Sequence, residues 1–529
     1  MVEEIVSPKN MAKPLSLLSA YDSTVTELTQ TPHDPVIQHR AVLALARAGS
    51  LDFAWAEYRR YGLDKFTTHQ DPKLLEDIMG LGARLLKDLF LASSGKAAKN
   101  YAVQSSEKYE AAYQITGGFY SGINAATMGL MGGMPGEIIK SRAQDLLRQL
   151  PPLTELDKET LYFIQATRAE ALLILGETYK ARQTLRRAIR HDPRNYIAHA
   201  STLRQFKMIL EKRGEDVAWL SAFEPPKPLH FSGHLFDIGT EAKRGVLSTA
   251  ARDQLKIDIS DSIQINDIGF GYGSLAAGSD ILIAEVLIDE GCDLHVTLPV
   301  EPDVFLEHSV APFGSDWASR FQSCWDEAVT RDVVSQSSIW PKYETDRFSN
   351  NVTMGKAILH SQHLSVGALQ LLIWDQKTQN MGTGRSASDW SQTGRKQIVL
   401  PYPAPRKKRV NPKNAVSVAI QVSLFDQEAN TELYSPDIYE MVQKAFDIQS
   451  KSGYISRIGL HIDILPTGSS TSETARQLAE NSVPGGILIS ESAVSVLLLQ
   501  HADKFTMDYM GRLGSGDNGI RAFALKRKG

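Results

Sequence analysis

The chain has 529 residues, of which 42% are apolar and 22% charged, and these ordinary proportions exclude collagen-like, disulfide-rich and wholly disordered proteins. The 57 Lys and Arg residues against 61 Asp and Glu residues give a net charge of −4, which disfavours nucleic acid as the main partner. The two cysteines, Cys292 and Cys324, form no metal-binding motif. Without an apolar leader or a run long enough to cross a bilayer, we expect a cytoplasmic protein of several domains with no membrane contact.

Residues 30–222 have helical periodicity almost throughout, and we expect a helical-repeat domain there. The window Tyr162–Tyr196 matches the spacing of a tetratricopeptide repeat of about 34 residues, and His33–Asp64 is a looser copy. Such repeats stack into an array that binds peptides or other domains. A plain helical bundle is the alternative. The small residues and helix stops that carry the repeat pattern are Gly49, Ala54, Ala169, Gly176, Ala181, Ala188 and Asp192-Pro193.

Proline-rich segments at both ends delimit a second domain over residues 226–402, because proline continues neither a helix nor a central strand. Short apolar runs alternate there with helical stretches, which predicts a doubly wound parallel α/β sheet. Ligands of such sheets bind beyond the carboxyl ends of the strands, near the point where the strand order reverses. The predicted strands are Leu229–Gly233, Ile263–Phe270, Asp293–Pro299, Ala368–Trp374 and Gln397–Leu400.

A glycine pattern follows the second predicted strand. Gly271 and Gly273, with Ser274 and Ala276, match the Gly-x-Gly-x-x-Ala form of the dinucleotide-binding fingerprint. In that interpretation the turn opens a helix whose amino end binds a phosphate, and Glu301 after the next strand binds a ribose hydroxyl. A glycine turn needed only for packing is the alternative.

Two further loops are predicted at the same sheet edge. Ser232, Gly233 and His234 follow the first strand, whereas Asp375 and the Gly382-Thr383 pair follow a later one. Small residues and hydroxyls suit a phosphate or sugar, and a carboxylate accepts hydrogen bonds from a ribose. Ordinary turn chemistry is the alternative for both loops, and a structural role is the alternative for His234.

Asp280 belongs to the helix that follows the glycine pattern, and we expect its carboxylate to face the ligand. Together with the glycine turn and the two loops, it completes the predicted ligand site.

The first two domains resemble known regulatory modules. Leu74–Leu89, Phe119–Leu130 and Ser201–Leu210 resemble the helical TRAF-binding region of apoptosis signal-regulating kinases and their bacterial relatives. Phe231–Asp237, Gly271–Glu290 and Ala368–Gly384 resemble the Rossmann-type domain of the SLOG group. The resemblance implies a signalling module, in bacteria often part of defence or stress systems, whose ligand is a nucleotide or a derivative of NAD.

Residues 411–529 resemble a class III nucleotidyl cyclase domain through Arg457–His461 and Val483–Glu491. The resemblance implies an α+β, ferredoxin-like fold that pairs as a homodimer. The catalytic residues depart from the family: Gln421 replaces the first metal-binding aspartate, Asp463 lies in an atypical loop, and Ser472 or Glu473 replaces the asparagine before Arg476. We therefore expect no cyclase activity.

Two hypotheses of function follow. In the first, the protein is a sensor or scaffold whose α/β domain binds a nucleotide-type ligand and whose helical repeats bind a protein partner. In the second, it is an enzyme, either a divergent cyclase or a hydrolase or transferase acting on a nucleotide at the α/β site.

Overall fold

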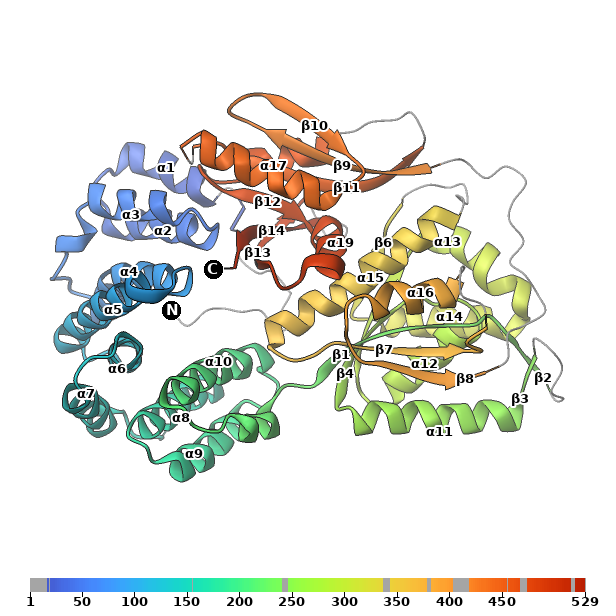
Figure 1. Ribbon diagram of the computed structural model, residues 1–529, viewed down its shortest axis with the longest axis horizontal. Helices are drawn as coiled ribbons and strands as arrows, with labels where there is room; N and C mark the ends of the chain where they lie inside the picture. Colours follow the sequence, from blue (N-terminus) through green and yellow to red (C-terminus); the bar gives the residue numbers. More distant parts are fainter. Residues whose placement is uncertain are drawn as a thin grey trace.

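Three parts follow one another along the chain: a helical array, a parallel α/β unit and a mixed α+β unit (Figure 1). The helical amino-terminal region and the later sheets agree with the predicted multidomain architecture. The computed structural model describes residues 17–18, 20–154, 156–239, 246–335, 343–377, 382–402, 418–453, 455–466, 473–514 and 519–528.

The helical array consists of consecutive helices packed against their chain neighbours. Asp34 and Asp71 are the N-caps of α2 and α4, where their carboxylates accept hydrogen bonds from backbone amides of the first turn. Each is followed by a proline, whose fixed φ suits the first helical position. Gly176, with φ +85°, allows the sharp turn inside the predicted repeat 162–196. The helices are α1 (Ala20–Gln30), α2 (Pro35–Arg47), α3 (Leu51–Arg60), α4 (Pro72–Leu91), α5 (Gly95–Thr116), α6 (Phe119–Gly132), α7 (Gly136–Gln149), α8 (Lys158–Ile174), α9 (Thr178–His191) and α10 (Tyr196–Arg213), with short 3₁₀ turns η2 (Leu63–Lys65) and η3 (Ala218–Phe223).

The α/β unit has a six-stranded parallel sheet with the order β6-β5-β4-β1-β7-β8. The order reverses between β1 and β7, as in a doubly wound sheet. Its strands are β1 (Lys227–Gly233), β4 (Ile268–Gly273), β5 (Asp293–Leu298), β6 (Thr330–Val333), β7 (Leu369–Trp374) and β8 (Gln397–Pro401), and β2 (Asp237–Gly239) and β3 (Val246–Ser248) form a separate pair.

Helices cover both faces of this sheet. One face is apolar and packs on α11 (Thr249–Ile265), α12 (Ser279–Asp289) and α14 (Ser315–Glu327). The other face carries polar side chains beneath α15 (Tyr343–Leu364) and α16 (Gly382–Ser391). There His230 Nε2 donates to Asn350 Oδ1 at 3.1 Å, Gln370 Nε2 donates to His230 Nδ1 at 3.0 Å, and Tyr272 bonds His360 at 2.8 Å. Hydrogen bonding offsets the cost of burying these groups.

The prediction of a strand at Ile263–Phe270 is wrong in its bounds. Helix α11 continues to Ile265, the chain turns at Asp267 with φ +53°, and strand β4 begins at Ile268. Strand β6 was not predicted. The other four predicted strands of this sheet are present within two residues at either end.

The carboxyl-terminal unit has a mixed sheet with the order β10-β9-β11-β12-β14-β13. Helices α15, α17 and α19 build the core on one face of this sheet, so α15 belongs to the cores of both sheets. The elements are β9 (Val418–Asp426), β10 (Thr431–Ser435), α17 (Ile438–Lys451), β11 (Ile458–Pro466), α18 (Glu473–Glu480), β12 (Ile487–Ser490), α19 (Glu491–His501), β13 (Phe505–Leu513) and β14 (Ile520–Arg527).

The two ends of the chain meet. Helices α1–α4 share a hydrophobic core with the other face of the carboxyl-terminal sheet (Figure 1). The Leu17 amide donates to the Met510 carbonyl at 2.7 Å, and Arg457 binds the Asp22 carboxylate with two hydrogen bonds of 2.6 and 2.7 Å. The three parts therefore form a closed arrangement. The proline-rich linker 403–410 and the Ser472 position lie outside the described residues.

Candidate functional site

The candidate site lies where the order of the parallel sheet reverses. Strands β1 and β7 are paired neighbours, and their carboxyl ends at Gly233 and Trp374 lie side by side. In a doubly wound sheet this point leaves a crevice, because the connecting segments leave in opposite directions. The two loops that the sequence predicted at this edge are therefore adjacent, with His234 in one and Asp375 in the other.

His234 and Asp375 form a pair across these loops. Their side chains are 10% and 9% exposed, and His234 Nε2 lies 3.2 Å from Asp375 Oδ1. The Asp375 amide donates to the same ring nitrogen at 3.1 Å, and Asp375 Oδ1 accepts from the Lys377 amide at 3.0 Å. Burial lowers the pKa of His234, and the nearby carboxylate only partly opposes that shift. The ring is therefore neutral at pH 7, and because Nε2 accepts from the Asp375 amide, the ring proton lies on Nδ1.

Asp280 and Ser279 bind the first loop from the amino end of α12. The Gly233 amide donates to Asp280 Oδ1 at 3.1 Å, and Ser279 Oγ donates to the His234 carbonyl at 2.7 Å. Gly278, with φ +100°, makes this approach possible, since a Cβ there would lie 2.6 Å from the Phe236 amide nitrogen. Asp280 therefore holds the end of β1 in place.

The structure corrects the role predicted for Gly271 and Gly273. Both lie inside strand β4 rather than in the turn before the helix. A Cβ on Gly271 would lie 2.3 Å from Leu287 Cδ1, and one on Gly273 would lie 2.2 Å from Phe231 Cε2. Gly271 makes room for Leu287 of α12 and Gly273 makes room for Phe231 of strand β1, so both serve packing, which is the alternative that the sequence left open.

The amino end of α12 is also already bonded to protein. The Ser279 amide donates to the His234 carbonyl at 3.1 Å, and the Ile281 amide donates to the Ala276 carbonyl at 3.4 Å. A phosphate at this helix end would have to displace those bonds.

The other predicted residues occupy three places. Ser232 belongs to strand β1, and Ser274 lies in the segment that leaves β4. Gly382, with φ +52°, and the buried Thr383 begin α16, the helix that follows the Asp375 loop. Glu301 precedes the short helix α13 (Pro302–Phe305) after β5, which is two strands away from β1 in the sheet. The sheet order thus brings Gly233, His234, Asp280 and Asp375 together and leaves Glu301 apart.

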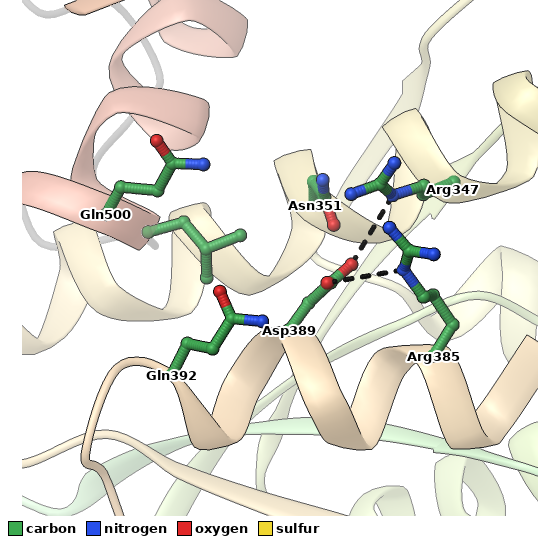
Figure 2. Close-up of a pocket in the computed structure, with 7 residues that line it drawn as sticks. Arg347, Asn351, Arg385, Asp389, Gln392 and Gln500 are labelled. Carbon is green, nitrogen blue, oxygen red and sulfur yellow. Dashed lines mark ion pairs between the residues drawn. The ribbon is translucent and has the colours of Figure 1, made fainter. Parts of the chain in front are cut away.

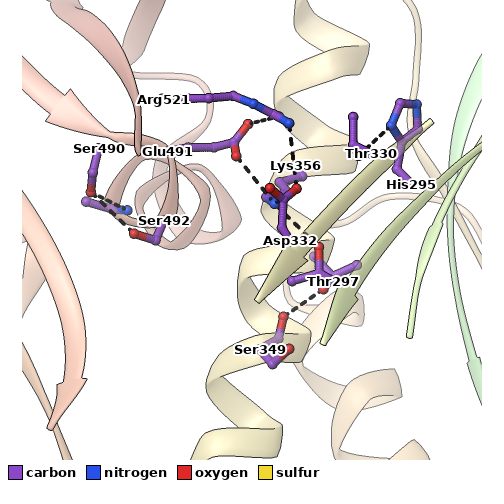
Figure 3. Close-up of polar contacts among 12 residues, drawn as sticks. His295, Thr297, Thr330, Asp332, Ser349, Lys356, Ser490, Glu491, Ser492 and Arg521 are labelled. Atoms are coloured by element: carbon purple, nitrogen blue, oxygen red, sulfur yellow. Dashed lines mark hydrogen bonds and ion pairs between the residues drawn. The ribbon is translucent and has the colours of Figure 1, made fainter. Parts of the chain in front are cut away.

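A buried group of four charges joins the two sheets (Figure 3). Lys356 Nζ lies 2.7 Å from Asp332 Oδ2 and 3.3 Å from Glu491 Oε2, and Arg521 Nη1 lies 2.7 Å from Glu491 Oε1. Burial alone would raise the pKa of Asp332, but Lys356 and Arg521 hold it well below its ordinary value. The sequence analysis missed this group, because its members come from β6, α15, α19 and β14.

The carboxyl-terminal sheet places the two cyclase-type positions opposite each other. Gln421 of β9 pairs with Asp463 of β11 in the antiparallel register. Burial raises the pKa of Asp463 to about 6, and Gln421 Oε1 is buried without a hydrogen-bond donor among the described residues. Arg476 of α18 pairs with Glu432 and lies over the Phe425 ring. In the described part of the chain, no three His, Cys, Asp or Glu side chains gather as a metal site.

Comparison with known families identifies the amino-terminal part of the array. Residues 19–129 match the family model Tetratricopeptide Repeats-Sensor, TPR-S. The TPR-S match runs from α1 into α6 and includes the looser repeat predicted at His33–Asp64, so the prediction of tetratricopeptide repeats is confirmed for this segment. The window Tyr162–Tyr196 lies beyond the TPR-S match and forms α8, α9 and the turn between them. A search of curated proteins gave no match.

Repeats of this class bind proteins, which agrees with the predicted protein partner. Over the ranges that the structure describes, no helix has the length and apolar character needed to span a bilayer.

Proposed function

We propose that the protein is a ligand-responsive regulator. In this proposal the α/β unit binds a nucleotide or an NAD derivative at the point where the sheet order reverses, and the other two parts transmit the bound state. The observation that carries the proposal is the convergence of His234, Asp375 and Asp280 at this edge. Such an edge is the usual ligand position of doubly wound sheets.

The residues suggest how a ligand would lie. The Asp375 carboxylate would accept a hydrogen bond from a ribose hydroxyl, whereas neutral His234, whose Nε2 accepts from the Asp375 amide, would donate from Nδ1. The amino end of α16, which begins at Gly382 and Thr383, is the positive end of the helix dipole and would attract a phosphate.

Helix α15 supplies a route by which binding would reach the rest of the molecule. It packs on the parallel sheet, on α19 of the carboxyl-terminal unit and on α10 of the array. At its end, Arg204 Nη1 donates to Ser365 Oγ at 2.8 Å, and His363 Nε2 donates to the Met507 carbonyl at 3.2 Å. A shift of α15 would therefore move contacts in all three parts, which is what a regulator with a partner on its repeats requires.

Ligand-induced stabilisation tests the proposal. NAD, ADP-ribose, ATP or a related nucleotide should raise the melting temperature of the wild type, since binding at a hundred times Kd adds about 2.7 kcal/mol of stability. His234→Ala and Asp375→Asn should fold and lose most of that shift. Asp253→Asn, an exposed carboxylate of α11 in the same unit, is the matched control and should respond like the wild type.

Mass spectrometry of small molecules retained on the purified protein would identify the ligand class. A shift that survives both His234→Ala and Asp375→Asn would place the nucleotide elsewhere.

The His234–Asp375 pair also favours a second candidate, an enzyme that hydrolyses or transfers part of a nucleotide. A neutral histidine beside a carboxylate is a common general-base pair, and His234 Nε2 would act as the base once a substrate displaces the Asp375 amide from it. Conversion of a nucleotide to products, lost in His234→Ala, would support this candidate over a purely regulatory role.

The predicted homodimer stays a prediction. Helices α15, α17 and α19 cover one face of the carboxyl-terminal sheet, and α18 and α1–α4 cover the other. Any pairing of two chains through this unit would therefore use an edge of the sheet rather than a face.

A further inference from the structure

A cavity of about 340 Å³ lies at the boundary between the α/β unit and the carboxyl-terminal unit. It is formed by α15 and α16 on one side and by the end of α19 on the other (Figure 2). Its volume is at the lower end of the range of about 300–1,000 Å³ for small-molecule sites. The cavity shares no lining residue with the His234–Asp375 site: from α16 and the turn after it, it takes Arg385, Asp389 and Gln392.

One end of the cavity is cationic. Arg347 Nε lies 3.5 Å from one oxygen of Asp389, and Arg385 Nε lies 3.5 Å from the other. These distances are those of loose ion pairs, and Asp389 Oδ2 receives no hydrogen bond from the described residues. The arginine side chains are 42% and 38% exposed, so their guanidinium groups are open to a ligand. Two positive charges against one negative charge leave this end with a net charge of +1.

The other end of the cavity carries amides. Gln392 and Gln500 lie across the cavity from the two arginines, and Asn351 lies between (Figure 2). Each amide both donates and accepts hydrogen bonds, as recognition of a polar heterocycle requires. Leu499 also lines the cavity and offers an apolar contact to such a ring.

We propose that this cavity binds a small molecule with a phosphate group at one end and a hydrogen-bonding heterocycle at the other, of which a nucleoside monophosphate is the simplest form. A phosphate suits the cationic end better than a carboxylate. Asp389 already supplies a planar carboxylate there, whereas the tetrahedral oxygens of a phosphate can accept from two guanidinium groups that come from different helices. Because α19 contributes Leu499 and Gln500, the bound ligand bridges the α/β unit and the carboxyl-terminal unit.

This site is separate from the one at the reversal of the sheet order. Its ligand is held by Arg347 and Arg385, whereas the other depends on His234 and Asp375. Variants at each site therefore test the two proposals independently.

Isothermal titration of the full chain with AMP, GMP and UMP tests the inference. We expect one of them to bind, inorganic phosphate to bind more weakly, and the matching nucleoside without phosphate to bind at least about tenfold more weakly. Arg347→Ala and Arg385→Ala should each weaken binding at least about tenfold, since each removes a charge-assisted hydrogen bond. Arg187→Ala, an exposed arginine on α9, is the matched control and should leave binding unchanged.

Two further variants separate a ligand site from a structural role. Asp389→Asn removes the carboxylate that competes for the guanidinium groups, so it should tighten phosphate binding, whereas a purely structural Asp389 would only lower stability. Gln500→Ala should change the preference among AMP, GMP and UMP, and His234→Ala should leave all three affinities unchanged.

Three results would overturn the inference. The first is that no monophosphate binds at millimolar concentration. The second is that binding persists in folded Arg347→Ala and Arg385→Ala proteins. The third is that His234→Ala loses binding while the arginine variants keep it. Circular dichroism of each variant establishes that it is folded.

Discussion

Gly355 fixes the distance between α15 and α19. A Cβ at this position would lie 2.1 Å from the Ser495 carbonyl oxygen, and that neighbour is backbone, which cannot rotate away. We expect Gly355→Ala to separate the two helices and to lower the free energy of unfolding by about 1–3 kcal/mol. Urea unfolding measures the loss. Gly367→Ala, with no atom within 4 Å of its Cβ, is the control and should stay within about 0.5 kcal/mol of the wild type.

The pairing of Gln421 with Asp463 makes a prediction about catalysis. A cyclase needs two carboxylates to fix its metal ions, but Gln421 supplies none, and burial raises the pKa of Asp463 to about 6. Purified protein supplied with ATP or GTP and Mg²⁺ or Mn²⁺ should therefore form no cyclic nucleotide by chromatography. Metal-dependent cyclic product that disappears in Asp463→Ala would show that this carboxylate is catalytic.

The sequence predicts the positions of some site residues but not of others. His234, Asp375 and Asp280 could be assigned to one sheet edge, because strands that alternate with helices imply a parallel sheet. The places of Gly271 and Gly273 could not be assigned. A glycine in a turn and a glycine packed against a neighbouring side chain share one sequence pattern, and only the contacts with Leu287 of α12 and Phe231 of β1 distinguish them. Gly273→Val would therefore test packing rather than phosphate binding.

Among the elements, α15 carries the most varied contacts, and its Lys356 is 7% exposed between Asp332 and Glu491. Lys356→Met keeps the side-chain length but leaves two carboxylates facing the single cation Arg521. Breaking a buried ion pair in this way costs about 3–5 kcal/mol, and we expect an unfolding free energy lower by that amount. Lys444→Met, in an exposed pair with Glu440, should change it by less than about 1 kcal/mol. A loss no larger than that of Lys444→Met would mean that the network is not stabilising.

A strand or helix could be predicted where an apolar pattern with clear ends marks it in the sequence. Strands β1, β5, β7 and β8 are apolar runs that end at Gly, Pro or polar residues, and the sequence places them well. Strand β6, Thr330–Val333, has two adjacent charged residues at its centre and no apolar run to reveal it. The contribution of α15 to both cores was not readable either, because a helix that is buried on several sides has no single apolar face.

At the scale of the whole molecule, buried histidines make stability depend on pH. Burial lowers the pKa of His39, His199 and His461 to about 4, and that of His230 and His295 to about 3. In the unfolded chain these histidines bind protons near pH 6.5, whereas in the folded chain they stay neutral until the pH is much lower. Their contribution to stability is therefore fully present above pH 6.5 and is lost as the pH drops toward 4. Asp88, Glu170 and Asp463, whose pKa values burial raises, oppose the trend.

For each of these buried neutral histidines, lowering the pH from 7.5 to 5.5 should reduce the free energy of unfolding by about 1.4 kcal/mol. Urea unfolding at those two pH values measures the sum, and we expect the midpoint to fall clearly at the lower pH. An unchanged midpoint would contradict the burial of these rings in their neutral form.

The core that α1–α4 share with the carboxyl-terminal sheet has a consequence for synthesis of the chain. Leu45, Ile78 and their neighbours pack against Leu488, Ala522 and Ala524, which are synthesised long after α1–α4. This apolar surface of the helices therefore stays uncovered until strands β12 and β14 have been made. A chain that stops before β14 would leave exposed the part of the surface that this strand covers.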